Sequence, residues 1–295
     1  MSDDRNFTII RLDLLKYLED FEKLRTALSD FFVKTRDCTL FGLYDESMNA
    51  SALLVSEYKS ECDIEILFLA SEDDSIESKK YLICYLTDHL PACGTITWRI
   101  PDTDSNKEIA AEFDFTCEYT VNLFRSVGAK DARLIETFKE NEKLLNYMMK
   151  FGYKTVNFDE LTEDELLQIR TNPDGEFESS LHPEVLMADT VGGFSPKFSF
   201  ASVRGGKVAA YTIIRCPDGK HCIFEIICVA KSFRCKGVFI LPFLYTLKTM
   251  DEYGIESGSF AIYEVNRPAL QIVEKRFSQL IVSHTIQHNY VYTGK

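Results

Sequence analysis

The stretch His221-Cys-Ile-Phe-Glu-Ile-Ile-Cys-Val-Ala-Lys-Ser-Phe-Arg-Cys-Lys-Gly-Val-Phe-Ile-Leu-Pro-Phe-Leu244 carries the clearest structural pattern in the chain. An apolar, β-rich run ends at Val229, a polar turn with Arg234 and Gly237 follows, and apolar residues then continue at helical spacing. A strand that leads into a helix N-terminus can bind an anion, because the N–H groups of the first helical turn have no partner within the helix. A glycine there lets a phosphate approach the backbone closely. An ordinary strand–helix connection shows the same pattern, so the stretch alone leaves both interpretations open.

Composition limits the class of protein. The chain has 295 residues, of which 45% are hydrophobic, and this length indicates about two domains. The 46 acidic residues outnumber the 33 basic ones, which argues against a nucleic-acid partner because phosphate backbones require clustered cations. The apolar runs are shorter than a membrane span, and no signal-peptide core follows the charged N-terminus. We therefore expect a cytoplasmic protein that binds neither nucleic acid nor membranes.

The cysteines and histidines predict no metal site. Several of the nine cysteines, including Cys84, Cys222 and Cys228, stand within apolar runs and are expected to be reduced and buried. The cysteines lack Cys-x-x-Cys spacing, and the five histidines are scattered along the chain.

The expected elements occur in the same order twice. The first copy comprises strand 7–11, helix 14–32, hairpin 39–44 and 52–58, strand 63–70, helix 75–90, strand 95–100, helix 106–113 and strand 118–124. The second comprises strand 155–158, a helix with a capping box at 162–165, helix 176–189, hairpin 198–203 and 208–215, strand 221–230, helix 238–253, strand 259–263, helix 266–276 and strand 280–292. An amphipathic helix at 131–150 separates the copies. The repetition predicts an α/β (α+β) protein with domains 1–128 and 153–295 joined by a linker helix at 129–152.

This order of elements resembles the GNAT superfamily of acyl-CoA-dependent N-acyltransferases, in a tandem form that covers nearly the whole chain. Each domain of that fold is a mixed, mostly antiparallel twisted sheet flanked by helices. In the family, a strand is followed by Arg/Gln-x-x-Gly-x-Gly/Ala, whose backbone amides bind the pyrophosphate of acetyl-CoA. Arg234 and Gly237 fit this motif, whereas the bulky Phe239 stands at its last small position. The resemblance implies acetyl-CoA as the acyl donor, bound in the C-terminal domain by Ile227, Cys228, Val229, Arg234, Cys235, Lys236, Gly237, Val238, Phe239 and Asn266.

A second family signature is only partly present. Asn266 opens a helix and Ala269 follows three residues later, as in the family. Val273, however, occupies the position of the tyrosine that, in the family, protonates the departing thiolate. Protonation by water or by another group such as Tyr263 would be needed, or catalysis would be lost.

The corresponding turn in the first copy is acidic. The strand Ile64–Ala70 resembles the strand before the phosphate turn, but Ser71-Glu72-Asp73-Asp74-Ser75 follows it. Three carboxylates beside a phosphate site would repel CoA. We expect the N-terminal domain not to bind the cofactor and to serve in packing, as one wall of the substrate cleft, or in dimerisation.

Glu225 is the candidate catalytic base. Strand alternation predicts that His221, Ile223, Glu225, Ile227 and Val229 share one face, and Glu225 is the lone carboxylate of this apolar strand. A glutamate paired with a neighbouring arginine or lysine at the edge of the cleft is the alternative. The resemblance also implies that the Val229 N–H polarises the thioester carbonyl.

These observations predict an acetyl-CoA-dependent N-acetyltransferase that acts on a small primary amine by direct transfer in a ternary complex. The alternative is a catalytically inactive tandem protein that senses acyl-CoA or binds other proteins. A homodimer is left open. The direction of Phe239 distinguishes the two functions: a side chain in the core leaves the phosphate turn open, whereas one that projects over the turn closes it.

Overall fold

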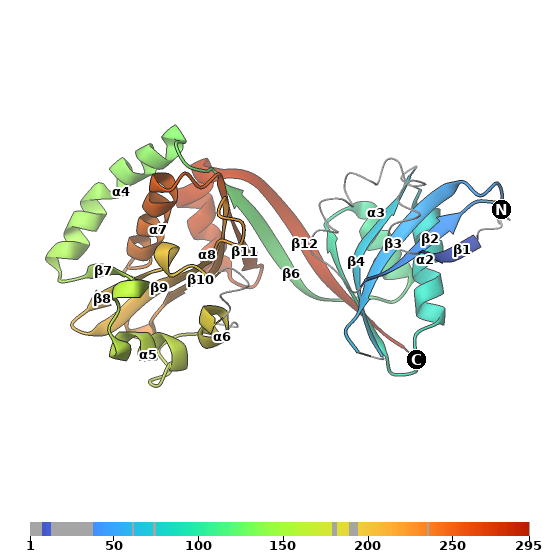
Figure 1. Ribbon diagram of the computed structural model, residues 1–295, viewed down its shortest axis with the longest axis horizontal. Coiled ribbons are helices and arrows are strands. Elements are labelled where there is room, and N and C mark those ends of the chain that lie inside the picture. Colours follow the sequence, from blue (N-terminus) through green and yellow to red (C-terminus); the bar gives the residue numbers. More distant parts are fainter. Residues whose placement is uncertain are drawn as a thin grey trace. The chain divides into compact units, whose positions relative to one another are not determined.

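The computed structural model describes residues 8–12, 38–60, 62–72, 75–178, 182–188, 194–234 and 236–294. The chain divides into two compact units, which we call unit 1 (residues 1–121 and 286–295) and unit 2 (residues 122–285) (Figure 1). The helix expected at 14–32 lies outside the described residues.

Unit 1 is a mixed sheet packed against helices. Its strand order is β1-β2-β3-β4-β5, followed by the C-terminal part of β12. Neighbouring strands pair antiparallel except β4 and β5, which are parallel. Trp98 and Leu82 are central to its core. The elements are β1 (Thr8–Leu12), β2 (Cys38–Tyr44), β3 (Ala50–Tyr58), β4 (Asp63–Ser71), α2 (Ile76–Asp88), β5 (Thr95–Pro101), α3 (Asp104–Glu112) and β12 (Ile281–Thr293).

Unit 2 repeats this plan with helices on both faces of its sheet. Its strand order is β6-β11-β10-β9-β8-β7, and β10 pairs with β11 in parallel. In Figure 1, α4 and α7 lie on one side of β7 to β10, and α5 and α6 lie on the other. The elements are the C-terminal part of β6 (Thr116–Ser126), α4 (Ala132–Lys150), β7 (Lys154–Asn157), α5 (Glu163–Thr171), α6 (Pro183–Ala188), β8 (Phe200–Arg204), β9 (Lys207–Arg215), β10 (His221–Val229), α7 (Ile240–Glu252), β11 (Ser257–Tyr263) and α8 (Arg267–Ile272).

Local sequence signals explain several element boundaries. Thr162 and Glu165 form the predicted capping box at the start of α5, with each side chain accepting from the other residue's backbone N–H. Ser75 Oγ accepts from the Ser78 N–H at 3.3 Å and caps α2. Gly205 and Gly206 both have positive φ, at 58° and 73°, in the turn between β8 and β9. The fold class expected from the sequence, two tandem GNAT-like domains, is confirmed by the comparisons reported below.

Two expected boundaries differ from the structure. The expected linker helix, α4, belongs to unit 2, because Leu134 packs into the same core as Leu244 and Leu247 of α7. The last strand, expected in the C-terminal domain, instead pairs its residues 287–293 with β5 of unit 1. The period of a strand reports which side chains are buried and not which strand lies beside it, so the sequence did not indicate this exchange.

The expected helix at 176–189 is also shorter. Helix α6 covers only Pro183–Ala188, and residues 172–178 form a loop. Asn172 adopts a left-handed conformation with φ 45°, and its side chain accepts from the Phe177 N–H and donates to the Phe177 carbonyl. This turn ends α5.

Candidate functional site

The two parallel strands at the centre of unit 2 part halfway along their length. Pairing between β10 and β11 covers only residues 221–224 and 257–260, although β10 continues to Val229 and β11 to Tyr263. A β-bulge stands at the point of parting: Phe224 lies opposite Ile214, Ile226 lies opposite the next residue of β9, and Glu225 is the extra residue between them. The bulge therefore opens a gap between two central strands.

Because of the bulge, the side chains at the end of β10 lie on the opposite face of the sheet from the one that the sequence predicts. Cys222 and Phe224 pack with α7, whereas Ile226 and Cys228 pack with the core under α5. Val229 returns to the α7 side, where it contacts the core that contains Val238. Ile227 and Val229 thus face opposite to His221 and Ile223, because one inserted residue reverses the alternation.

The backbone at the end of β10 is turned toward the gap. The Ala230 N–H donates to the Ala209 carbonyl at 2.9 Å. Hydrogen-bonded pairs alternate along an antiparallel ladder, so the backbone groups of residues 226, 228 and 230 are the ones that form hydrogen bonds with β9. Alternation then turns the N–H and C=O groups of Ile227 and Val229 away from β9, on the side where the pairing with β11 has ended. An extended ligand with amide groups can add here as a strand does.

The connection from β10 to α7 is the turn at which the sequence predicts an anion site. It runs from residue 230 to 239 and includes Gly237, whose φ of +70° is a conformation that other residues adopt only with strain. No described residue accepts a hydrogen bond from the N–H groups of Gly237, Val238 or Phe239. Cys235, which belongs to the expected site, lies outside the described residues.

The Phe239 side chain points into the core. It packs against the cluster that contains Ile240 and Phe243, and its ring lies edge-on to Phe277 at 6.5 Å between centroids. This is the direction that leaves the turn open to a ligand.

The basic side chains of the turn contact acidic and backbone groups of the protein. Glu178 accepts from Arg234 at 2.7 Å, and its other carboxylate oxygen lies 3.2 Å from Lys231 Nζ. Arg234, followed by Lys231, lowers the pKa of the Glu178 carboxyl. Lys236 donates to the Ser232 carbonyl at 3.0 Å. A carboxylate therefore holds the arginine at which the resemblance places a phosphate.

Glu225 forms an ion pair with the last residue of β9. Its Oε1 accepts from Arg215 Nη1 at 3.2 Å, and the two side chains are 21% and 28% exposed. This is the arrangement of the alternative interpretation, a glutamate paired at the edge of the gap. No described residue donates to Oε2, so one carboxylate oxygen is left for a water or a ligand.

The two residues of the second family signature have structural roles. Asn266 Oδ1 accepts from the Ala269 N–H at 3.3 Å and caps α8, as its position predicts. Val273 is buried against Phe124 and Leu270, at the start of a π-helical turn over residues 273–277. A side chain at position 273 therefore supports the core and does not face the gap.

Unit 1 contains the same parting of strands without the turn. Pairing of β4 with β5 stops at Ile66 and Trp98, and Leu67 is the bulged residue. The connection from β4 to α2, however, consists of residues 72–75 only. It is too short to hold a turn like that of residues 230–239.

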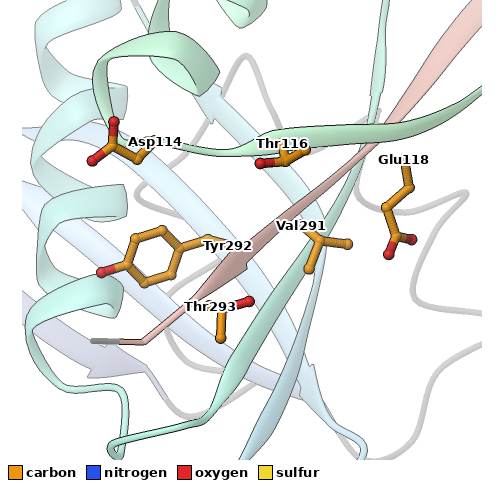
Figure 2. A pocket seen from close by; sticks show the side chains of 6 residues that line it. All are labelled: Asp114, Thr116, Glu118, Val291, Tyr292 and Thr293. Carbon is orange, nitrogen blue, oxygen red and sulfur yellow. The ribbon is translucent and has the colours of Figure 1, made fainter.

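Each unit contains an open cavity. The one in unit 1, about 310 Å³, is shown in Figure 2 and is lined by Asp114, Thr116, Glu118, Val291, Tyr292 and Thr293. One of about 440 Å³ in unit 2 lies beside the turn, where Ala230, Ser232 and Phe233 form part of its wall. Among the described residues, no group of acidic, histidine or cysteine side chains could hold a metal ion. The same part of the chain contains no helix long and apolar enough to cross a membrane.

Sequence reasoning missed Arg215 and Glu178. Each of them contacts a residue that is distant in the chain. Arg215 and Glu225 are separated by ten positions, and Glu178 and Arg234 by 56. The charge of Arg215 at a strand end was the only signal in the sequence, and it did not identify a partner.

Solved structures share this architecture over nearly the whole chain. A GCN5-related N-acetyltransferase from Sphaerobacter thermophilus matches with a TM-score of 0.63 and 8% identity, over 97% of this chain and 95% of that one. A tandem GNAT protein from the clavulanic acid biosynthesis pathway matches with a TM-score of 0.57 and 9% identity, over 98% of both chains. A GNAT-family acetyltransferase from Colwellia psychrerythraea matches with a TM-score of 0.52 and 12% identity, over 96% and 99%.

These similarities define the class of fold. The chain has the GNAT fold in tandem form. No protein-family model and no curated protein matches its sequence.

Proposed function

We propose that the protein is an acetyl-CoA-dependent N-acetyltransferase that acts on a small primary amine through unit 2. The observation that carries this proposal is the combination of the parted strands with an open turn: the backbone of Ile227 and Val229 faces the gap, and Phe239 is turned into the core. Unit 1 has the same parted strands, so the connection with Gly237 is the part of this combination that distinguishes unit 2.

The donor would be held mainly by backbone groups. The amides of its pantetheine arm would form hydrogen bonds with the backbone N–H and C=O groups of Ile227 and Val229. Its pyrophosphate would accept hydrogen bonds from the N–H groups that follow Gly237 and from those at the start of α7. Arg234 would leave Glu178 and bind a phosphate oxygen, which offers it a stronger charge. The proposed contacts of Cys228, Lys236, Val238 and Asn266 rest on the resemblance alone.

The transfer forms a C–N bond, breaks the C–S bond and moves two protons. The neutral amine nitrogen attacks the thioester carbonyl carbon, whose oxygen takes up negative charge that the Val229 N–H stabilises. The C–S bond then breaks and releases the thiolate. The attacking nitrogen loses one proton, and Glu225 would accept it through water at its Oε2, while Arg215 holds Oε1 in place.

The thiolate needs a proton from a group other than residue 273. Val273 has no acidic proton and is buried. Tyr263, at the exposed end of β11, is 43% exposed and is the nearest substitute along the strand that borders the gap. Water is the alternative donor.

A second candidate function is an acyl-CoA-binding module without catalysis. The buried Val273 and the carboxylate that holds Arg234 are the observations that favour it. Acetyl-CoA binding without turnover would identify this function.

The first test compares two glycine variants by calorimetry with acetyl-CoA. Gly237→Glu places a carboxylate in the turn, and Gly219→Glu is a matched control because both glycines have a φ of 70°. We expect binding by the intact protein and by Gly219→Glu, and at least a 100-fold loss of affinity in Gly237→Glu. Absence of binding by the folded, intact protein would overturn the proposal. Thiol release with a panel of primary amines then separates the enzyme from the binding module.

A further inference from the structure

A polar cluster lies on β6, β10 and β11, before the point where the strands part. We call this set the β11 cluster: Arg125, His221, Ser257 and Ser259. His221 spans the two strands, with Nδ1 2.7 Å from Ser257 Oγ and Nε2 2.8 Å from Ser259 Oγ. Arg125 Nη2 donates to the same Ser257 hydroxyl at 3.3 Å.

The cluster occupies the face of the sheet opposite α7. Gly258 and Phe260 point toward α7, because a Cβ on Gly258 would meet Met250 and because Phe260 packs with the α7 core. Ser257 and Ser259 alternate with them and therefore face the other way. Arg215 lies on this same face, since Ile213 two residues earlier packs under α5. The cluster and the Glu225–Arg215 pair thus share one side of the sheet.

The hydrogen bonds leave donors available to a ligand. A neutral imidazole donates through one nitrogen and accepts through the other, so one serine accepts from His221 and keeps its own O–H for another acceptor. Arg125 is exposed, and the one hydrogen bond that its side chain forms with a described residue uses one of five guanidinium donors. No described carboxylate forms an ion pair with it. Asp218, three residues before His221, accepts through Oδ1 from the N–H groups of Lys220 and His221.

The β11 cluster contains basic groups although the whole chain is acidic. The protein carries a formal net charge of −13, yet the cluster holds the guanidinium of Arg125 and the imidazole of His221, and the ion pair of Glu225 with Arg215 lies on the same side of the sheet. A guanidinium that is ordered by a serine and lacks an acidic partner among the described residues is suited to a carboxylate or a phosphate.

We propose that the β11 cluster binds an anionic group, a carboxylate or a phosphate, on the acceptor amine. This inference rests on the proposed function, because it takes Glu225 to mark the position of the reacting nitrogen. His221 stands four residues before Glu225, about 13 Å along a strand. The acceptor is therefore an amine with its anionic group several carbon atoms away, and not a diamine or a polyamine.

Direct binding tests the cluster without requiring acetyl-CoA. The probes are 8-aminooctanoate, 8-aminooctyl phosphate and 1,8-diaminooctane, which share a chain length and differ in the charge at one end. Calorimetry with the intact protein should show binding of at least one anionic probe and at least tenfold weaker binding of the diamine. The stronger of the two anionic probes identifies the anion. Equal or preferred binding of the diamine would overturn the proposal.

Variants at position 125 locate the effect. Arg125→Gln should weaken binding of the anionic probe at least tenfold and leave binding of the diamine unchanged. Arg125→Lys should weaken binding of the anionic probe less than Arg125→Gln does. Arg170→Gln, at an exposed arginine in the last turn of α5, is the control and should have no effect. The assignment of the anion site to Arg125 would be contradicted if Arg125→Gln and Arg170→Gln lost affinity for the anionic probe to the same extent, or if neither variant lost it.

Kinetics separates this inference from the proposed function. In an active protein, Arg125→Gln should raise KM for the anionic amine about tenfold with kcat and acetyl-CoA affinity little changed. Acetyl-CoA turnover with a preference for the diamine would retain the function and overturn the anion site. Anion binding at Arg125 without acetyl-CoA binding would retain the site and overturn the function.

Discussion

Units 1 and 2 contain the same parted strands but differ in the connection that leads from them to the next helix. In each unit the parallel pairing covers four residues, a bulge comes next, and the two strands separate. Unit 2 then has the ten-residue connection 230–239 with Gly237, whereas unit 1 passes directly from Ser71 through residues 72–75 into α2. The sheet geometry is thus a property of the fold, and the ligand site depends on the connection. Four predictions test this difference.

The largest effect is expected at the two bulged residues. Glu225→Gln should lower kcat about 100-fold or more because it removes the proton acceptor, with acetyl-CoA affinity little changed. Leu67→Gln, at the equivalent position of unit 1, should leave kcat within twofold. Thiol-release kinetics measures both. A normal rate in Glu225→Gln would show that the pair with Arg215 is only structural.

Acetyl-CoA should protect unit 2 and not unit 1. A ligand at 100 times its Kd stabilises the state that binds it by about 2.7 kcal/mol, which slows globally exchanging amides about 100-fold. Hydrogen exchange should therefore slow in β9, β10 and α7 and remain unchanged in β3, β4 and α2. Equal protection of both units would mean that they unfold together or that unit 1 also binds the donor.

Removing the carboxylate that holds Arg234 should strengthen donor binding modestly. Glu178→Gln abolishes the charge that competes with phosphate, so we expect about threefold tighter acetyl-CoA binding, in line with the small energies of exposed ion pairs. Glu160→Gln, an exposed glutamate elsewhere in unit 2, is the control. Weaker binding in Glu178→Gln would instead show that Glu178 orients Arg234 for the ligand.

The smallest effect concerns the start of α4. Side-chain and backbone hydrogen bonds from Arg133 lower the pKa of the Asp131 carboxyl from 3.8 to about 2. Because the folded pKa is the lower one, this contribution to stability is present above pH 3.8 and is lost as the pH falls toward 2. The free energy of unfolding of unit 2 should be lower at about pH 2.5 than at about pH 4.5, and this decrease should be smaller in Asp131→Asn than in the unmodified protein. An identical decrease in both proteins would assign the effect to other carboxyls.

Much of the fold can be predicted from local patterns. Thr162 and Glu165 predicted the start of α5, Gly205 and Gly206 the hairpin turn, and Asn266 the start of α8. Each signal depends on residues within a few positions of one another, where backbone hydrogen bonding is set by the nearest side chains.

The candidate site was harder to predict, because a single inserted residue changed it. The bulge at Glu225 reversed the face of Ile227 and Val229, and alternation in the sequence showed no break there. A bulge places two residues of one strand opposite one residue of its partner, so it depends on the pairing of the two strands and not on the bulged strand alone. The partners Arg215 for Glu225 and Glu178 for Arg234 were hidden for the same reason.

The sequence by itself determined the order of the elements, their duplication and the place of the turn at Gly237. These features depend on periodicity and on local backbone conformation. Tertiary structure decided that the end of β12 pairs with β5, that Phe239 enters the core, and that Arg125 joins His221 through Ser257. These contacts join residues far apart in the chain, and packing of the complete sheet selects among neighbours that local sequence leaves equivalent.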